Sequence, residues 1–300
     1  MLSKSIAITA IVAAIALHTE SAAAEYGWPV KPFHEQHAIR GNFCDPRIAK
    51  WVETFHFGVD VYAPNGTAVY ATQSGVATIM PRHGKTVVVT APSGRVFQYW
   101  HIAPTIRSGQ WVTAYRTVVG HIEYPWAHVH FTEVLGGQIV NPLRPGALTP
   151  YADSVPPVFV SMRLERSGEP VSPNPLRGSV DIVANIFDAP PIKPATPWRE
   201  AVVAPALIQW RVRNKDGVVR RWASAVDFRR VRPSNSLFRW VYAARTIQNR
   251  ALRSGRYRFY VAHRWDTTRL HDGDYVVQVI AVDHRANANV FSYPVTIDNH

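Results

Sequence analysis

Cysteine is almost absent from this sequence: Cys44 is the only one among 300 residues. A disulfide needs two cysteines, so an intramolecular disulfide is excluded and the fold must depend on its hydrophobic core. Cys44 has no lipobox around it and lies well beyond the N-terminus, which argues against a lipoprotein. We expect it to be a small buried residue.

Long hydrophobic runs are also missing. The longest, IAITAIVAAIAL, has about 12 residues, fewer than the roughly 20 that a membrane-spanning helix needs. Lys4 precedes this run and Ala22, Ala23 and Ala24 follow it, which is the pattern of a secretory signal with a small-residue cleavage site. We therefore expect residues 1–24 to be a signal peptide and the protein to be exported, either periplasmic or extracellular and associated with the cell wall. The alternative is a retained N-terminal anchor.

Acidic residues are scarce, because 21 Asp and Glu stand against 33 Lys and Arg, for a net charge of +12. Residues 211–258 contain 14 Lys and Arg but only Asp216 and Asp227, so this block carries the whole excess. Such a block attracts anionic surfaces, and salt weakens the attraction. For an exported protein we expect an anionic cell-envelope polymer or lipid head groups as the partner; the alternative is a set of solvated strand positions. No nucleic-acid-binding motif is present, so nucleic acid is not an expected partner.

Length and strand patterns predict two all-β domains. The 300-residue chain exceeds one comfortable core, and the proline-bearing stretch LRPGALTPYADSVPP suggests a boundary, so we place the domains at residues 25–152 and 153–300. In the second, segments such as SVDIVANIFD alternate apolar and polar residues between turn residues, which is typical of a β-sandwich. DGDYVVQVIAVDHRANA resembles the last hairpin of immunoglobulin-like domains. PSNSLFRWVYAARTIQNRAL has a helical pattern and is expected to be an insertion.

Five residues suited to metal binding or proton transfer stand in three short motifs: His56 and Asp60 in FHFGVD, His101 in QYWHI, and His128 and His130 in AHVHF. Imidazole and carboxylate groups are usual nitrogen and oxygen ligands of zinc. His128 and His130 are two apart, so on a β-strand both rings lie on one face. The chain has no HExxH motif, so the helical glutamate base of many zinc proteases is missing. A histidine that titrates near neutral pH suits that task.

The sequence around these motifs resembles the lysostaphin-type (LytM-like) zinc metallopeptidases, which cut peptide bonds in bacterial cell walls. The match runs from about Trp28 to Pro145. HFGVDVYAPNGTAVYATQSGVATIM is similar to the family's HxGxD segment, QYWHI to its tyrosine-x-histidine, and AHVHFTEVLGGQIVNPLRPG to its closing HxHFE strand. The resemblance implies a lysostaphin-like antiparallel β-sheet domain of the duplicated hybrid motif type.

The resemblance also implies roles for the five residues. His56, Asp60 and His130 match the family's three zinc ligands. His101 and His128 match the two histidines that act on the water and on the tetrahedral intermediate. One Zn²⁺ is therefore the expected cofactor, and the implied function is that of a secreted zinc metalloendopeptidase, a hydrolase of peptidoglycan stem or cross-bridge peptides.

Other functions stay open at this point. Family members that have lost metal ligands are non-catalytic wall-binding or regulatory proteins on the same fold, and a protease of extracellular proteins would use the same residues. A purely structural zinc site would normally be closed by four ligands. Two departures from the family bear on substrate choice. The short connection HIEYPWA precedes the HxH motif, and Thr132 stands where the family has glutamate, with Glu133 one place on.

The remaining aromatic and histidine residues have weaker signals. Trp100, Trp111 and Trp126 are candidate walls of a substrate cleft, although packing against the sheet explains them equally well. The other histidines of the first domain are interpreted as structural or surface residues, and these are His34, His37, His83 and His121.

Overall fold

The computed structural model describes residues 25–50, 52–80 and 85–300 of the chain. Strands dominate these residues, and the ladders between the named strands are antiparallel. The one α-helix in the described part, α1 (Phe238–Val241), has four residues. The expected all-β class is therefore confirmed. The expected signal peptide lies outside the described residues, and within them no helix is long and apolar enough to cross a membrane.

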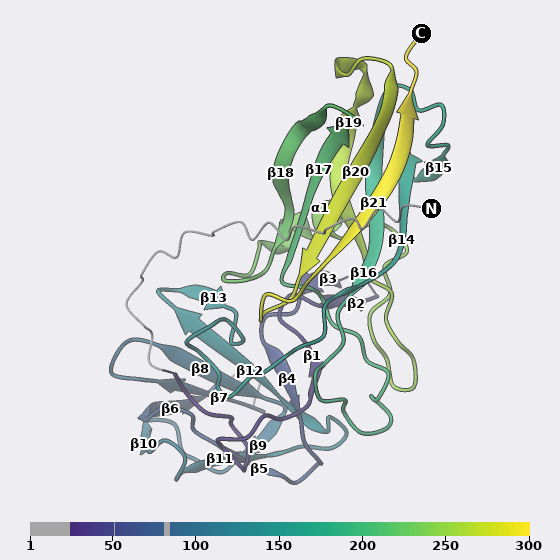
Figure 1. The fold of residues 1–300 in the computed structure, drawn as a ribbon. Helices are drawn as coiled ribbons and strands as arrows, with labels where there is room; N and C mark the ends of the chain where they lie inside the picture. The colour runs from purple at the N-terminus through teal and green to yellow at the C-terminus, as the bar shows by residue number, and fades with distance from the viewer. Residues whose placement is uncertain (1–24, 51, 81–84) are drawn as a thin grey trace, which may run out of the picture.

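The N-terminal half of the chain forms two antiparallel sheets and a hairpin (Figure 1). The larger sheet has the strand order β1-β4-β12-β8-β7-β6-β10, with β13 paired to β12, and the smaller one has the order β5-β11-β9. The strands of this half are β1 (Ile39–Gly41), β2 (Pro46–Ala49), β3 (Val52–Phe55), β4 (Val59–Tyr62), β5 (Ala68–Tyr70), β6 (Gly75–Ile79), β7 (Thr86–Thr90), β8 (Val96–Trp100), β9 (Ile102–Pro104), β10 (Gln110–Val112), β11 (Val118–Ile122), β12 (His128–Leu135) and β13 (Gln138–Val140).

Strand β12 lies at the centre of the larger sheet, and its sequence fixes its register. Val129 and Phe131 are fully buried in the hydrophobic core, so the alternation of a strand places His128 and His130 on the other face. A slip of one residue would exchange the two faces and is therefore strongly disfavoured. In this register His130 lies opposite Asp60 of the neighbouring strand β4.

The C-terminal half forms two four-stranded antiparallel sheets, in the orders β15-β14-β16-β19 and β18-β17-β20-β21. Ring contacts join them: Trp210 to Trp265 with centroids 6.1 Å apart, and Phe159 to Phe291 with centroids 5.6 Å apart. The sheets therefore share an aromatic interior, as a sandwich does. Their strands are β14 (Val158–Arg166), β15 (Glu169–Val171), β16 (Ser179–Phe187), β17 (Leu207–Asn214), β18 (Gly217–Asp227), β19 (Arg258–Asp266), β20 (Gly273–Val282) and β21 (Ala288–Ile297).

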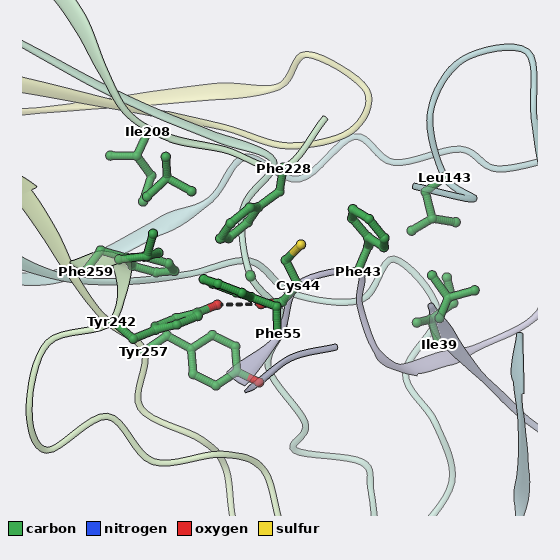
Figure 2. Close-up of a cluster of buried hydrophobic side chains, with 14 of the residues drawn as sticks. Ile39, Phe43, Cys44, Phe55, Leu143, Ile208, Phe228, Tyr242, Tyr257 and Phe259 are labelled. Atoms are coloured by element: carbon green, nitrogen blue, oxygen red, sulfur yellow. Dashed lines mark hydrogen bonds between the residues drawn. The ribbon is translucent and has the colours of Figure 1, made fainter. Parts of the chain in front are cut away.

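The two halves are joined by a common aromatic cluster (Figure 2). Phe55, at the end of the β2–β3 hairpin, is fully buried among Phe228, Phe238 and Tyr242, with ring centroids 5.3–5.9 Å away. The hydroxyl of Tyr242 donates to the backbone carbonyl oxygen of Cys44 at 2.8 Å. Cys44 itself is fully buried, as expected. The predicted boundary between residues 152 and 153 therefore separates two sets of sheets that nevertheless share packing.

The expected helix after residue 232 is wrong in its length. Only a 3₁₀ turn, η1 (Asn235–Leu237), and the four-residue α1 form there. The backbone becomes extended at Tyr242, with φ −95° and ψ 118°, and Tyr242 pairs with Phe259 of β19. The burial of these aromatic side chains in the shared cluster outweighs the local helical preference.

Candidate active site

The five residues singled out in the sequence meet around one cavity of about 470 Å³. His56 follows β3, Asp60 lies in β4, His101 follows β8, and His128 and His130 lie in β12. Strand β12 pairs with β4 on one side and β8 on the other. The sheet order thus brings Asp60, His101, His128 and His130 to one place, and His56 joins them from the segment between the β2–β3 hairpin and β4.

Three of these side chains direct one atom each toward a common point. The Nε2 atom of His56 lies 2.6 Å from Nδ1 of His130 and 3.0 Å from Oδ1 of Asp60. The same Asp60 oxygen lies 3.1 Å from Nδ1 of His130. All three residues are buried. The atoms are close enough together to be neighbouring ligands of one ion whose bonds are about 2.0–2.2 Å long.

A glycine permits this approach. Gly58 lies between His56 and Asp60, and a Cβ atom built on it would stand 2.2 Å from the backbone carbonyl oxygen of Phe131 in β12. Real Cβ atoms do not approach a carbonyl oxygen so closely. The segment between the two candidate ligands can therefore lie against β12 only if this position carries no side chain.

The hydrogen bonds of His56 show why this arrangement fits a cation. Its Nδ1 lies 2.7 Å from the backbone carbonyl oxygen of Asn42, which can only accept, so the ring proton is on Nδ1. Burial lowers the pKa of His56 to about 3, so a second proton on Nε2 is absent at neutral pH. The Nε2 lone pair then faces a carboxylate oxygen of Asp60 at 3.0 Å. Two acceptors at that distance repel each other unless a cation lies between them.

Asp60 is held ionised by its surroundings. Burial alone would raise its pKa, but its surroundings, which include the guanidinium of Arg47, outweigh burial and hold the pKa well below the usual range. Arg47 donates from Nη2 to Oδ2 of Asp60 at 2.8 Å. This contact occupies one carboxylate oxygen and leaves the other, Oδ1, directed at the two imidazole nitrogens.

His128 and His101 lie beside the three candidate ligands. The Nδ1 atom of His128 donates to the backbone carbonyl oxygen of Trp126 at 2.7 Å, so its Nε2 faces Asp60 at 3.4 Å. The ring of His101 lies 4.8 Å from that of His128, centroid to centroid. Burial, followed by the nearby His128, lowers the pKa of His101 to about 3. At neutral pH His101 is therefore a neutral imidazole, and burial makes it a weaker base than a histidine that titrates near neutral pH.

Thr132 and Glu133 follow each other in β12, and both are buried, but on opposite faces of the strand. The hydroxyl of Thr132 lies 2.9 Å from Nε2 of His130 and fixes the orientation of that ring. Glu133 belongs to the opposite face, where Arg95 and Arg144 donate to its carboxylate at 2.6–3.1 Å. Tyr26 donates to the same carboxylate at 2.6 Å. Glu133 therefore lies away from the cavity, on the face of β12 opposite His130.

Other residues around the cavity carried little or no signal in the sequence. Arg40 and Arg47 line the cavity. Their position shortly before FHFGVD in the sequence is the one feature that could have indicated this. Trp198, Gln248 and Asn249 also line it, and nothing local in the sequence connects them to the five residues. These three residues belong to loops of the C-terminal half that pack against the N-terminal half.

The remaining candidates divide clearly. Trp100 and Trp126 line the cavity, whereas Trp111 lies in the edge strand β10 and is 56% exposed. His37 bonds to the carbonyl oxygen of Pro32, away from the cavity, and His83 lies outside the described residues. Among the described residues, His34 and His121 do not line the cavity either.

Comparisons with known proteins gave distant structural matches only. Neither a protein-family model nor a curated protein matches this chain. The catalytic domain of the antimicrobial peptidase lysostaphin from Staphylococcus simulans is 20% identical, over 34% of this chain and 86% of that one, with a TM-score of 0.29. A zinc-containing peptidase from Vibrio cholerae is 22% identical, over 39% of each chain, with a TM-score of 0.32. A mutant catalytic domain of the prophage-encoded M23 protein EnpA from Enterococcus faecalis is 22% identical over 40% of this chain and 98% of that one, with a TM-score of 0.32.

Proposed function

We propose that this protein is an exported zinc metalloendopeptidase that hydrolyses peptide bonds in peptidoglycan. The observation that carries the proposal is the convergence of Nε2 of His56, Oδ1 of Asp60 and Nδ1 of His130 within 3.1 Å of one another. With the ring proton of His130 on Nε2, donated to Thr132, all three are acceptor atoms in a buried place, and they fit a divalent cation. Three ligands leave a fourth position open, as catalytic zinc sites do. The sequence motifs that carry the family resemblance support zinc as the bound ion and peptidoglycan as the substrate.

In this proposal the five side chains divide the work. His56, Asp60 and His130 hold the ion, which would supply Lewis-acid activation of water and of the scissile carbonyl group. His101 and His128 share the remaining tasks. One accepts the proton of the attacking water, and the other donates a hydrogen bond to the developing oxyanion and then a proton to the leaving amine.

The supporting contacts are suited to these tasks. The carbonyl oxygen of Asn42 and the hydroxyl of Thr132 orient the two ligand imidazoles through the ring nitrogens that face away from the ion. Such partners fix ring orientation in metal sites. Arg47 holds the far oxygen of Asp60. Together they prearrange the ligand atoms, so little reorganisation would accompany metal binding.

The test compares zinc content with peptidoglycan hydrolysis in the protein and in point variants. His101→Ala should keep about one zinc and lose on the order of 100- to 10,000-fold in rate, whereas His130→Ala should lose both zinc and activity. His121→Ala, an exposed histidine outside the cavity, is the matched control and should behave as the unchanged protein. If the unchanged protein binds no zinc and releases no wall fragments, the proposal is wrong and a wall-binding role replaces it.

A parallel incubation distinguishes peptidoglycan from the second candidate substrate, an extracellular protein. Purified walls and an unfolded protein are offered side by side to the zinc-loaded enzyme. Cleavage of the unfolded protein alone would favour the protease of extracellular proteins, and cleavage of walls would favour the peptidoglycan hydrolase.

The basic block of residues 211–258 has a more divided structure than its sequence suggests. Its members on β17 and β18 belong to one sheet of the C-terminal half, and Arg258 on β19 belongs to the other. Arg245, Arg256 and Arg258 join Arg163 of β14 around a hollow of about 350 Å³. We propose this hollow as the docking point for an anionic envelope polymer.

That docking proposal is best tested by point variants. Deleting the C-terminal half would expose Phe55 and its partners, so loss of binding by a truncated chain would have two explanations. The double variant Arg163→Ala/Arg245→Ala should bind walls less tightly at low salt, and Arg220→Ala/Arg221→Ala on β18 is the charge-matched control. Equal binding by both doubles across a salt series would remove the hollow from consideration.

A further inference from the structure

Two loops of the C-terminal half form one wall of the candidate active site. One comprises residues 188–206, between β16 and β17, and the other residues 242–257, between α1 and β19. Figure 1 shows long loops of the C-terminal half extending down beside β1 and β4. Trp198 of the first loop and Gln248 and Asn249 of the second line the cavity.

These loops are fixed to one another. The side chain of Asn249 donates from Nδ2 to the carbonyl oxygen of Val202 at 2.6 Å, and its Oδ1 accepts from the backbone N–H of Gly255 at 2.7 Å. The backbone N–H of Leu252 donates to the carbonyl oxygen of Pro197 at 2.7 Å. Several such hydrogen bonds together hold the two loops in one conformation.

The loops are also fixed to the segment that carries the candidate ligands. Asp45 accepts from the backbone N–H of Ala204 at 2.7 Å, and the side chain of Gln248 accepts from the backbone N–H of Ile48 at 2.5 Å. Asp45 and Ile48 precede His56 in the β2–β3 region. The wall is therefore a defined part of the cavity.

Arg40 of β1 lies against this wall. The ring of Trp198 covers its guanidinium at 4.0 Å, and Nη1 donates to the carbonyl oxygen of Trp126 at 3.1 Å. The side chain is only 12% exposed. Among the described residues, the carboxylate within ion-pair distance is Asp60, whose Oδ2 is 3.9 Å away and already accepts from Arg47 at 2.8 Å. A guanidinium this deeply buried usually has a carboxylate in direct contact.

The charged side chains that line the cavity carry a net positive charge. Its charged lining residues are Arg40, Arg47 and Asp60, so two guanidinium groups face one carboxylate, and a divalent ion at His56 and His130 would add further positive charge. A cavity lined by one sign of charge concentrates ligands of the other sign.

We propose that Arg40, with Trp198 packed on its guanidinium, is a substrate-binding subsite that selects a peptide residue carrying a free carboxylate close to the scissile bond. This inference rests on the proposed peptidase function and names its substrate class. Arginine suits the task because its planar fork binds a carboxylate through two parallel hydrogen bonds. The aromatic wall keeps water from the pair and strengthens it.

The experiment uses the zinc-loaded full-length protein and one peptidoglycan preparation, half of it with its carboxylates converted to carboxamides by carbodiimide and ammonium. The unchanged protein should release fragments from the native wall at least about tenfold faster than from the amidated wall. Arg40→Gln should lose this preference while keeping its zinc, and Trp198→Ala should reduce it severalfold. Trp111→Ala, an exposed tryptophan outside the cavity, is the matched control and should keep the full ratio.

Two further arms keep the outcome decisive. Arg40→Lys retains the charge but not the planar fork, so it should retain part of the preference for the native wall. This variant provides the test if Arg40→Gln does not fold. Elevated salt suppresses the general attraction between a basic protein and an anionic wall. The release rate from the native wall should nevertheless stay above the rate from the amidated wall. Equal rates on both walls for the unchanged protein, or an unchanged ratio in Arg40→Gln, would overturn the subsite.

Failure of the proposed function would look different. In that case the unchanged protein would release fragments from neither wall, the result that we expect for His101→Ala. Co-sedimentation of the protein with the two walls would then still report the carboxylate preference, and its loss in Arg40→Gln would still locate it.

Discussion

The indole ring of Trp126 lies almost parallel to the imidazole of His101, with centroids 3.9 Å apart and planes inclined by 16°. The backbone carbonyl oxygen of Trp126 also accepts from Nδ1 of His128 at 2.7 Å and from Arg40 at 3.1 Å. One residue of the connection before the HxH motif thus positions both candidate catalytic histidines. Its side chain acts on His101, and its backbone acts on His128.

This relationship predicts that the two contributions can be separated. Trp126→Ala removes the stacked ring but keeps the carbonyl oxygen, so His101 should lose its fixed orientation while His128 keeps its own. We expect kcat to fall about tenfold or more, because small misplacements of a catalytic group are costly, with zinc content unchanged. Trp126→Phe should recover most of the rate. A wild-type kcat in Trp126→Ala would show that stacking does not position His101.

The aromatic cluster shared by both halves predicts joint unfolding. Phe55→Ala should lower the free energy of unfolding by about 3–5 kcal/mol, the usual cost of removing a buried aromatic ring. Because Phe55 contacts Phe228 and Phe238, tryptophan fluorescence during urea unfolding should show one transition that moves as a whole. Leu252→Ala, whose side chain is 78% exposed, is the control. Two transitions, of which only the first moves, would contradict shared packing.

The buried carboxylate of Glu133 predicts a second stability effect. Burial would raise its pKa, but Arg144, Tyr26 and Arg95 outweigh burial and lower it. Glu133→Gln removes the charge of a buried carboxylate that both Arg95 and Arg144 bind, so we expect a loss of about 3–5 kcal/mol in unfolding free energy. The measurement is urea unfolding at neutral pH beside Glu35→Gln, which changes an exposed carboxylate. A loss no larger than that of the control would mean that neighbouring groups compensate the arginines.

A group of three acidic side chains, Asp153, Asp188 and Asp283, predicts the pH dependence of stability. Burial, together with its two acidic neighbours, raises the pKa of Asp188 from 3.8 to about 8. The folded protein therefore binds a proton that the unfolded chain releases between these values, and stability falls as the pH rises from about 4 to about 8. Asp45, whose pKa burial raises to about 7, acts in the same direction.

Asp188→Asn should remove much of this dependence, because an amide has no proton to lose. Melting temperatures at about pH 5 and about pH 8.5 should differ less in Asp188→Asn than in the unchanged protein. Asp216→Asn, on an exposed turn, is the control. An equal decline in all three proteins would place the dependence at other groups.

Much of the candidate site followed from local sequence patterns. The two-residue spacing of His128 and His130 predicted a shared strand face, and their burial on β12 shows that face. His56 and Asp60 share the short motif FHFGVD, and their side chains are neighbours in the structure. These relationships depend on strand alternation and on short chain segments, which a sequence displays directly.

Long-range relationships could not be predicted in this way. Trp198 covers Arg40 because a loop of one half folds onto the other, and no local pattern encodes that contact. The length of α1 was predicted wrongly for the same reason, since the burial of Phe238 and Tyr242 depends on partners from β3. The spatial arrangement of the basic block could not be predicted either, because its residues are divided between β17 and β18 of one sheet, the segment after them, and β19 of the other sheet.

The packing of Phe55 against Phe228, Phe238 and Tyr242 also has a consequence for how this protein can change over generations or in the laboratory. A catalytic cassette that closes its own surface can be cut out and recombined with new partners. Here an exchange at the linker would expose an aromatic face and remove Trp198 from beside Arg40. The two halves are thus expected to be inherited, engineered and replaced together.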